Sequence, residues 1–403
     1  MKILYGVVGE GMGHATRSRV ILEHLLAGGH EVLVVVSGRA FGFLRDVFAT
    51  RVGPGPATVT VREIVGLYLV YEGGEVDKSE SFWNNLAGAP DALHHNLGVY
   101  RDVVGSFSPD VVVSDFESWA YFFGRSQELP VISIDNMQII NRCRHELDVK
   151  SGPSGLPALD YRIAKLSVKV KLPGAYHYLV SSFFHPPVRK PRTTLVPPIL
   201  RPEILAARRA PGEHVLVYQT SSANRALLDT LSSFDLPFRV YGMGTDRHPG
   251  LGENITLRPF SQGGFIDDLR TARAVVAGGG YSLMGEAVHL RVPMFAIPLK
   301  KQFEQELNAR YLDRLGYGAW APELTAEGLR DFFAELPAYA DALEGYVPRG
   351  NEMLFACIDE LLRRVELGEP RPEALEAPNL GDIVSARVER LVQRLEGADP
   401  TEA

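Results

Sequence analysis

Short apolar runs alternate with helix-length segments along most of the chain. In the first part of the sequence these runs are Lys2–Val8, Glu31–Val36, Asp110–Asp115, Pro130–Ile134 and Tyr176–Ser182. Their apolar residues are mostly consecutive and do not alternate with polar ones, which is typical of strands buried on both faces of a parallel sheet. Segments with helical spacing lie between several of them. This order of strands and helices predicts an α/β fold with a doubly wound parallel sheet.

A second series of apolar runs follows a proline-dense segment. That segment, PPVRKPRTTLVPPILRP at residues 186–202, has no periodic pattern and is predicted to be an extended linker. The runs after it are His214–Gln219, Phe238–Tyr241, Ile255–Leu257, Ala274–Ala277 and Pro293–Pro298. We therefore predict two domains, at residues 1–185 and 203–345, which suits a length of 403 residues. Residues 346–403 are predicted to form a helix and a charged, peripheral tail.

The stretch from Val275 to Ala309 contains the most informative group of polar residues. A buried strand leads into Gly278–Gly280, and a helix carrying Glu286 follows. Free N–H groups at such a helix start suit a phosphate, and a carboxylate one turn later suits ribose hydroxyls. After the next strand come Lys300, Lys301, Glu304 and Gln305, at the same edge of a parallel sheet, where open α/β sheets bind ligands. We interpret the stretch as a nucleotide-sugar site; the alternative is an ordinary βαβ turn.

The first strand also ends in a glycine-rich loop, Gly9-Glu-Gly-Met-Gly-His14. An NAD fingerprint would be Gly-x-Gly-x-x-Gly, with an acidic residue closing the second strand. This loop has a different spacing, and the second strand closes on Ser37-Gly38-Arg39. NAD is therefore not expected, whereas an NADP-dependent oxidoreductase stays an alternative. His14 has an ordinary pKa suited to general base catalysis, and the other interpretation is a polar residue at a helix start.

The stretch VVAGGGYSLMGEAVHLRVPMFAIPLKKQFEQELNA resembles the donor-binding region of GT-B glycosyltransferases, above all the peptidoglycan N-acetylglucosaminyltransferase and the UDP-glycosyltransferases. This resemblance implies two Rossmann-like domains facing across a cleft, with a terminal helix that crosses back to the first domain. It implies that Gly279 and Gly280 hold the diphosphate, Glu286 the ribose, and Glu304 with Gln305 the sugar hydroxyls. The neighbouring residues in the predicted donor site are Tyr281, Ser282 and Lys300. Where many relatives have Ser or Thr, this chain has Leu283, so Ser282 is expected to supply the hydroxyl.

The run GEGMGHATRS resembles the first loop of the same fold and is close to a little-characterised bacterial and archaeal group. The resemblance implies that His14 is the general base and that Gly11 and Gly13 lie beside the substrates. Asp115 is our candidate for orienting His14, and capping of the next helix is its alternative role. Arg17 is expected to face the diphosphate or solvent.

Further donor contacts are placed by the resemblance in the second domain. Thr220 and Ser221 follow its first strand and match a second phosphate-binding turn. The stretch Arg258–Ser261 lies where relatives hold the base, so Arg258, Phe260 and Ser261 are base-site candidates. The stacking Trp and following Gln of plant-type members are replaced by Leu257 and Phe260, which leaves the base open, with UDP expected.

Charge and composition limit the classes of molecule that the protein is expected to bind. A net charge of −7 argues against a general nucleic-acid binder. Two distant cysteines and a start directly on a strand, without an apolar leader, suggest a cytoplasmic protein. Residues 141–171 are different, because basic residues gather there around leucines. Such a basic amphipathic helix suits a peripheral contact with an anionic membrane or a lipid-phosphate acceptor, and a solvated helix packed on the sheet is the alternative.

The sequence thus predicts an inverting glycosyltransferase that moves a sugar from a UDP-sugar to a hydroxyl of a small molecule or lipid-linked glycan. Retaining relatives carry a second Glu where this chain has Gly278, which favours inversion. No Asp-x-Asp motif is present, so no metal is expected, and no cofactor is called for. The alternatives are a sugar-nucleotide epimerase of the same fold, an NADP-dependent oxidoreductase and a non-catalytic sugar-nucleotide sensor.

Overall fold

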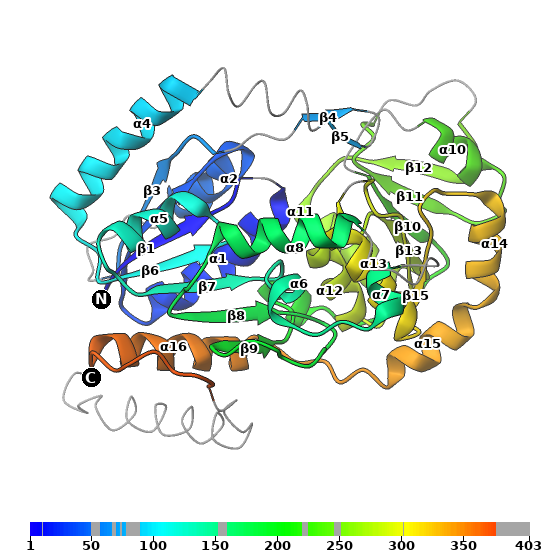
Figure 1. The fold of residues 1–403 in the computed structure, drawn as a ribbon. Coiled ribbons are helices and arrows are strands. Elements are labelled where there is room, and N and C mark those ends of the chain that lie inside the picture. Colours follow the sequence, from blue (N-terminus) through cyan, green and yellow to red (C-terminus); the bar gives the residue numbers. More distant parts are fainter. Residues whose placement is uncertain are drawn as a thin grey trace, which may run out of the picture.

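The computed structural model describes residues 1–9, 11–49, 57–66, 70–72, 75–77, 89–151, 159–219, 225–245, 251–300 and 302–375. Within these residues the chain forms two α/β units, each built on its own parallel sheet (Figure 1). The predicted α/β class with two doubly wound units is therefore confirmed. Residues 376–403, which belong to the predicted peripheral tail, lie outside the described residues.

The first sheet has seven parallel strands in the order β3-β2-β1-β6-β7-β8-β9. They are β1 (Lys2–Val7), β2 (Glu31–Val36), β3 (Val59–Glu63), β6 (Val111–Asp115), β7 (Val131–Asp135), β8 (His177–Ser181) and β9 (Thr193–Val196). Three of them, β6, β7 and β8, are buried along their whole length, and β1 and β2 are buried in all but their first residue, as the consecutive apolar runs predicted. A short antiparallel pair, β4 (Val70–Glu72) and β5 (Glu75–Asp77), lies apart from this sheet.

Helices cover both faces of the first sheet. One face is packed by α1 (Met12–Ala27), α2 (Gly38–Phe48) and α16 (Glu352–Glu366). The other is packed by α5 (Ser118–Ser126), α6 (Ile139–Arg142) and α8 (Leu159–Lys171). The remaining helices of this unit are α4 (Ala89–Asp102), which continues into a π-helical turn at Val103–Phe107, and α7 (Leu147–Ser151).

The second sheet has six parallel strands in the order β12-β11-β10-β13-β14-β15. They are β10 (Val215–Tyr218), β11 (Phe238–Tyr241), β12 (Ile255–Arg258), β13 (Ala274–Ala277), β14 (Met294–Ala296) and β15 (Gly318–Trp320). Its helices are α10 (Arg225–Ser232), α11 (Gln262–Thr271), α12 (Tyr281–His289), α13 (Phe303–Arg314), α14 (Ala326–Ala334) and α15 (Leu336–Glu344). The face with α11, α12 and α13 shares one continuous apolar cluster with the first unit.

The stretch expected to be an extended linker is partly structured. Its Thr193–Val196 forms β9, which pairs with β8 at the edge of the first sheet, and Pro202–Ala206 forms the short helix α9. The four residues of β9 include two threonines and a valine, which favour strands, and the prolines on either side had concealed this signal. The chain therefore passes from the first unit to the second through the short segment around Leu200, between β9 and α9.

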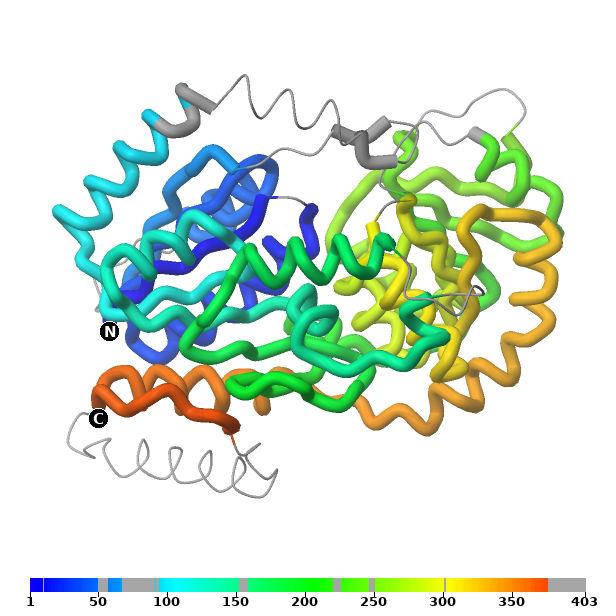
Figure 2. The backbone as a smooth tube through the Cα atoms, in the orientation of Figure 1, coloured from blue at the N-terminus to red at the C-terminus, as the bar shows by residue number. Residues whose placement is uncertain are grey.

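The chain crosses between the units a second time before α16. Leu354, Ile358 and Leu361 of α16 are buried against the first sheet, far from α14 and α15 (Figure 2). Asn351, directly before this helix, joins the two crossings, because its side chain accepts from Leu200 N at 2.9 Å and donates to Leu200 O at 2.7 Å. The first unit is therefore built from both ends of the chain.

Candidate active site

His14 and Asp115 meet at the carboxyl edge of the first sheet. Gly11, with a φ of 84°, is the N-cap of α1 and turns the chain after β1, so that His14 lies in the first turn of the helix. Asp115 ends the neighbouring strand β6 and pairs in register with Val7 of β1. His14 Nδ1 lies 2.9 Å from Asp115 Oδ1. The structure therefore brings the two predicted catalytic residues into direct contact.

Arg17 lies beneath this pair and is buried. It donates through Nε to Asp115 Oδ2 at 2.9 Å and through Nη1 to Asn136 Oδ1 at 2.6 Å, and its Nη2 also contacts Asp115. Ser18 Oγ donates to Asp115 Oδ2 as well, at 2.9 Å. This placement differs from the expected one, in which Arg17 faces a diphosphate or solvent. The buried carboxylate of Asp115 needs a cationic partner, and one turn of helix from His14 supplies it.

Burial, with the charge of Arg17, favours the neutral form of His14, and Arg17 with His14 favours the ionised form of Asp115. Burial alone would raise the pKa of Asp115, but Arg17 and then His14 outweigh it and hold that pKa far below its ordinary value. Burial, and next the charge of Arg17, lower the pKa of His14 below its ordinary value, although Asp115 acts in the opposite direction. At neutral pH the imidazole is therefore free to accept a proton.

Two groups compete for Nδ1 of His14, and they assign opposite tautomers. With the proton on Nδ1 the ring donates to Asp115, and the lone pair of Nε2 is available as a base. With the proton on Nε2 the ring instead accepts at Nδ1 from Arg17 Nη2, 2.7 Å away. General base catalysis through Nε2 would require the first tautomer, in which the ring donates to Asp115.

Asp115 does not cap the helix that follows it. The N-cap of α5 is Glu117, which accepts from Trp119 N at 2.8 Å and from Ala120 N at 2.6 Å. The alternative role that we considered for Asp115 therefore belongs to Glu117. Since Glu117 is buried under its own helix, it is also a poor substitute for His14 as a base.

A hydrogen bond connects this cluster to the second domain. Asn136, which follows β7, accepts from Arg17 and donates through Nδ2 to Glu304 Oε1 at 2.6 Å. Asn308, one turn after Glu304 on α13, donates to the same oxygen at 2.6 Å. Burial raises the pKa of Glu304, against the effect of these two donors. The predicted sugar-binding carboxylate thus lies one residue away from the His14–Asp115–Arg17 cluster.

The glycine turn before α12 divides into a packed and an open part. A Cβ at Gly279 would lie 2.5 Å from Gln305 O, whereas a Cβ at Gly280 would meet no atom within 4 Å. Gln305 Oε1 accepts from Gly279 N and Leu299 N, each at 3.1 Å. Gly279 therefore allows close packing of the turn on α13, and Gln305 holds it there. Gly280 is the N-cap of α12 and faces free space.

Glu286 is engaged by a residue that we did not single out. Arg201, the N-cap residue of α9, donates to it through Nε and Nη2, both at 2.7 Å, and both residues are buried. Burial raises the pKa of Glu286, although Arg201 acts in the opposite direction. A carboxylate offers about four lone-pair positions, and a bidentate guanidinium occupies two of them. Two acceptor positions of this carboxylate are therefore not used by Arg201.

Two other predicted donor residues lie where the domains touch. The hydroxyl of Tyr281 lies 2.7 Å from Ser181 Oγ, at the end of β8, and the ring is buried beside Phe183. A Cβ at Gly13 would lie 2.6 Å from Ser282 Oγ. Tyr281 therefore contributes to packing between the domains, and Gly13 allows the first loop to approach α12.

The remaining candidates lie toward the surface or outside the described residues. Arg258 pairs with Asp268 at 3.1 Å, and Phe260 is 67% exposed. Ser261 caps α11 by accepting from Gly264 N at 3.2 Å. Lys300 pairs with Glu323 at 2.9 Å on the surface. Thr220 and Ser221 lie outside the described residues.

Two absences concern only the part of the chain that the structure describes. There, no three His, Cys, Asp or Glu residues gather in a way that would hold a metal ion. In the same residues no helix is long and apolar enough to cross a membrane.

Several glycosyltransferases of known structure have a similar fold. The kitacinnamycin glycotransferase matches with a TM-score of 0.61 and 18% identity, over 90% of this chain and 98% of that chain. LpCGTa, solved in complex with UDP, matches with a TM-score of 0.60 and 15% identity, over 90% of this chain and 99% of that chain. MurG of Acinetobacter baumannii matches with a TM-score of 0.55 and 14% identity, over 89% of this chain and 99% of that chain. The fold is therefore the GT-B fold of these glycosyltransferases.

The sequence places the chain more closely. The model of glycosyl transferase family 1 matches residues 1–337, and the chain belongs to this family. An uncharacterized glycosyltransferase of Methanosarcina mazei is 26% identical over 373 residues, which cover 82% of this chain and 89% of that protein. One of Methanosarcina acetivorans is 25% identical over 341 residues, covering 81% and 84%. The predicted glycosyltransferase is therefore confirmed.

Proposed function

We propose that the enzyme transfers a sugar from a UDP-sugar to an acceptor hydroxyl with inversion and without a metal ion. The observation that supports this most is the contact between His14 and Asp115, joined through Arg17 and Asn136 to Glu304 of the other domain. It sets a neutral base beside the predicted sugar-binding carboxylate. The UDP in the solved complex of the structural relative LpCGTa supports the choice of nucleotide.

We propose the following course for the reaction. His14 Nε2 takes the proton of the acceptor hydroxyl as its oxygen bonds to the anomeric carbon, on the face opposite the diphosphate. The bond between that carbon and the phosphate oxygen breaks, and its electron pair leaves with UDP. Free N–H groups at the start of α12, beside Gly280, would stabilise the negative charge that develops on the diphosphate. Asp115 stabilises the imidazolium of His14 that results.

The acceptor is a hydroxyl compound, either a small molecule or a lipid-linked glycan. The test is incubation with UDP-sugars and a panel of such acceptors, in the presence and absence of EDTA, followed by NMR of the product. We expect a product of inverted anomeric configuration and equal rates with and without EDTA. Retained configuration would contradict the mechanism, and interconversion of a UDP-sugar without an acceptor would indicate an epimerase.

We expect Glu286→Gln to weaken UDP binding by about 10–100-fold, because a hydrogen bond to a charged carboxylate is replaced by one to a neutral amide. The variant should also unfold at a lower temperature, since Arg201 would be left buried without its anionic partner. Calorimetry and thermal unfolding measure the two effects. The matched control is Glu344→Gln, which removes the carboxylate of an exposed pair with Arg291 and should change neither. Unchanged UDP affinity in Glu286→Gln would remove the ribose role.

We expect Glu304→Gln to lower the affinity for the UDP-sugar by about 10-fold and to leave UDP affinity unchanged. The substitution keeps an oxygen that can accept from Asn136 or Asn308, so the contact between the domains is retained in part. Gln305→Ala is the matched comparison, because it frees the glycine turn and should weaken both ligands. Equal losses for UDP and UDP-sugar in Glu304→Gln would assign this carboxylate to the nucleotide or to the fold.

A further inference from the structure

Helix α8 carries an unusual stripe of exposed apolar side chains, which we call the apolar stripe. It consists of Leu159, Ile163, Leu166 and Val170, which are 71%, 45%, 59% and 58% exposed. Their spacing of four, three and four residues places them on one side of the helix. The described chain exposes 14 large apolar residues, and these four lie on a single helix of 13 residues. Such a concentration of exposed apolar side chains is typical of a site that binds a protein, a membrane or a ligand.

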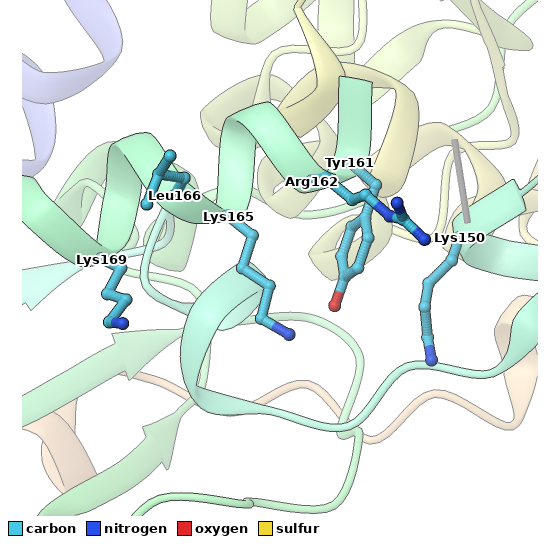
Figure 3. A pocket seen from close by; sticks show the side chains of 6 residues that line it. All are labelled: Lys150, Tyr161, Arg162, Lys165, Leu166 and Lys169. Atoms are coloured by element: carbon cyan, nitrogen blue, oxygen red, sulfur yellow. The ribbon is translucent and has the colours of Figure 1, made fainter. Parts of the chain in front are cut away.

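A group of cations, the basic rim, borders the apolar stripe. It consists of Lys150 of α7 and Arg162, Lys165 and Lys169 of α8. Together with Tyr161 and Leu166 these residues line a hollow of about 450 Å³, in which Lys165, Lys169 and Tyr161 extend to one side of the helix (Figure 3). The lining contains no carboxylate. The hollow is therefore suited to an anion.

The basic rim is not neutralised within the described part of the chain. There, no carboxylate forms an ion pair with any of its four residues. The positive charge of the basic rim also acts on a neighbouring lysine. Burial, and then Arg142, Arg189, Lys165 and Lys169, lower the pKa of Lys190 to about 8. Positive charge therefore accumulates on one face of a protein whose net charge is −7.

We propose that the apolar stripe and the basic rim bind the surface of a membrane of anionic lipids, with a lipid phosphate group in the hollow. Apolar side chains enter the boundary between headgroups and acyl chains, while lysines and arginines pair with the headgroups. A second copy of the chain is a poorer partner, because a symmetric contact would set one basic rim against another. The proposal does not depend on the nucleotide-sugar chemistry.

The position of α8 relates this surface to the candidate active site. At one end Tyr161 packs edge-on against Phe303, next to Glu304, with ring centroids 5.4 Å apart. At the other end Lys171 lies over the ring of Phe116, next to Asp115, at 4.1 Å. Helix α8 therefore contacts the sequence neighbours of Glu304 and Asp115. An acceptor held at the membrane would approach the enzyme on this side.

Vesicle sedimentation with the full chain tests the proposal. We expect binding to vesicles that mix phosphatidylglycerol with phosphatidylcholine, weak binding to phosphatidylcholine alone, and release by salt. The triple variant Arg162→Glu, Lys165→Glu, Lys169→Glu should lose affinity by about 100-fold. The matched control reverses the charge of three exposed arginines of the second domain, Arg208, Arg273 and Arg330, and should bind vesicles like the wild type. Circular dichroism checks that every variant is folded.

A second variant tests the contribution of the apolar stripe to membrane binding separately from that of the charges. Ile163→Ser with Leu166→Ser keeps the basic rim, and we expect it to bind anionic vesicles more weakly than the wild type. Three results would overturn the proposal: equal binding to neutral and anionic vesicles, equal loss in the control triple variant, or soluble glycerol phosphate binding as tightly as vesicles. Light scattering checks for a fourth result that would overturn the proposal. If the wild type were a dimer and the Ile163→Ser, Leu166→Ser variant a monomer, the surface would bind a second copy of the chain.

Discussion

We expect His14→Ala to lower turnover by about 10²–10⁴-fold, the usual contribution of a general base. The acceptor hydroxyl would then attack without a group to take its proton, whereas the donor, for which we propose contacts mainly with the second domain, would bind almost unchanged. Initial rates with a saturating acceptor and calorimetry with UDP measure the two quantities. His94→Ala, which removes an exposed histidine of α4, is the matched control and should keep full activity.

The pH dependence gives an independent check on His14. Because burial and Arg17 lower its pKa, the imidazole stays neutral to a lower pH than an ordinary histidine does. The acidic limb of kcat/KM should therefore lie below the ordinary histidine pKa of about 6.5, and it should vanish in His14→Ala. Turnover close to that of the wild type in His14→Ala would make His14 a structural residue of the loop.

The largest effect on stability is expected for Asp115→Ala. This change leaves the guanidinium of Arg17 buried without its counterion and costs about 3–5 kcal/mol, a large part of the stability of an ordinary domain. Denaturant unfolding measures it. The double variant Asp115→Ala, Arg17→Met removes both charges and should recover part of the loss. A single variant as stable as the wild type would show that the ion pair is not holding the two elements together.

The same ion pair has a pH signature. The pKa of Asp115 is lower in the folded protein than in the unfolded chain, so the stabilisation is present above the unfolded value of about 3.9 and is lost as the pH falls below it. We expect the free energy of unfolding to fall in this acidic range, and to fall less steeply in Asp115→Asn. Activity should also drop in Asp115→Asn, because an amide does not stabilise the imidazolium of His14.

Much of the fold could be predicted because it depends on neighbours in the sequence. Strands such as Val111–Asp115 are consecutive apolar runs, and their carboxyl ends share one sheet edge, which is why Asp115 could be placed near His14. Strand β9 was missed because its four residues stand between prolines. The pairing that holds it comes from β8, which a local pattern does not show.

The contacts in the site that the sequence did not reveal are those between residues far apart in the chain. Asn136 and Glu304 are separated by 168 positions, and Arg201 and Glu286 by 85, so no spacing rule connects them. Arg17 was visible on the correct turn of helix, but its burial depends on the strand ends beneath it. Asn308 was the exception, because it lies four residues after Glu304 on one helix and could have been found.

The return of α16 to the first sheet bears on how the chain folds as it is synthesised. The strand β1 leaves the ribosome early, yet Leu354, Ile358 and Leu361, which cover its sheet, are translated after the whole second domain. One apolar cluster of the second domain lies entirely within residues 215–336 and is complete before α16 appears. The second domain can thus condense first, while the nascent first domain keeps an apolar face open to chaperones. The order of completion would then be the reverse of the order of translation.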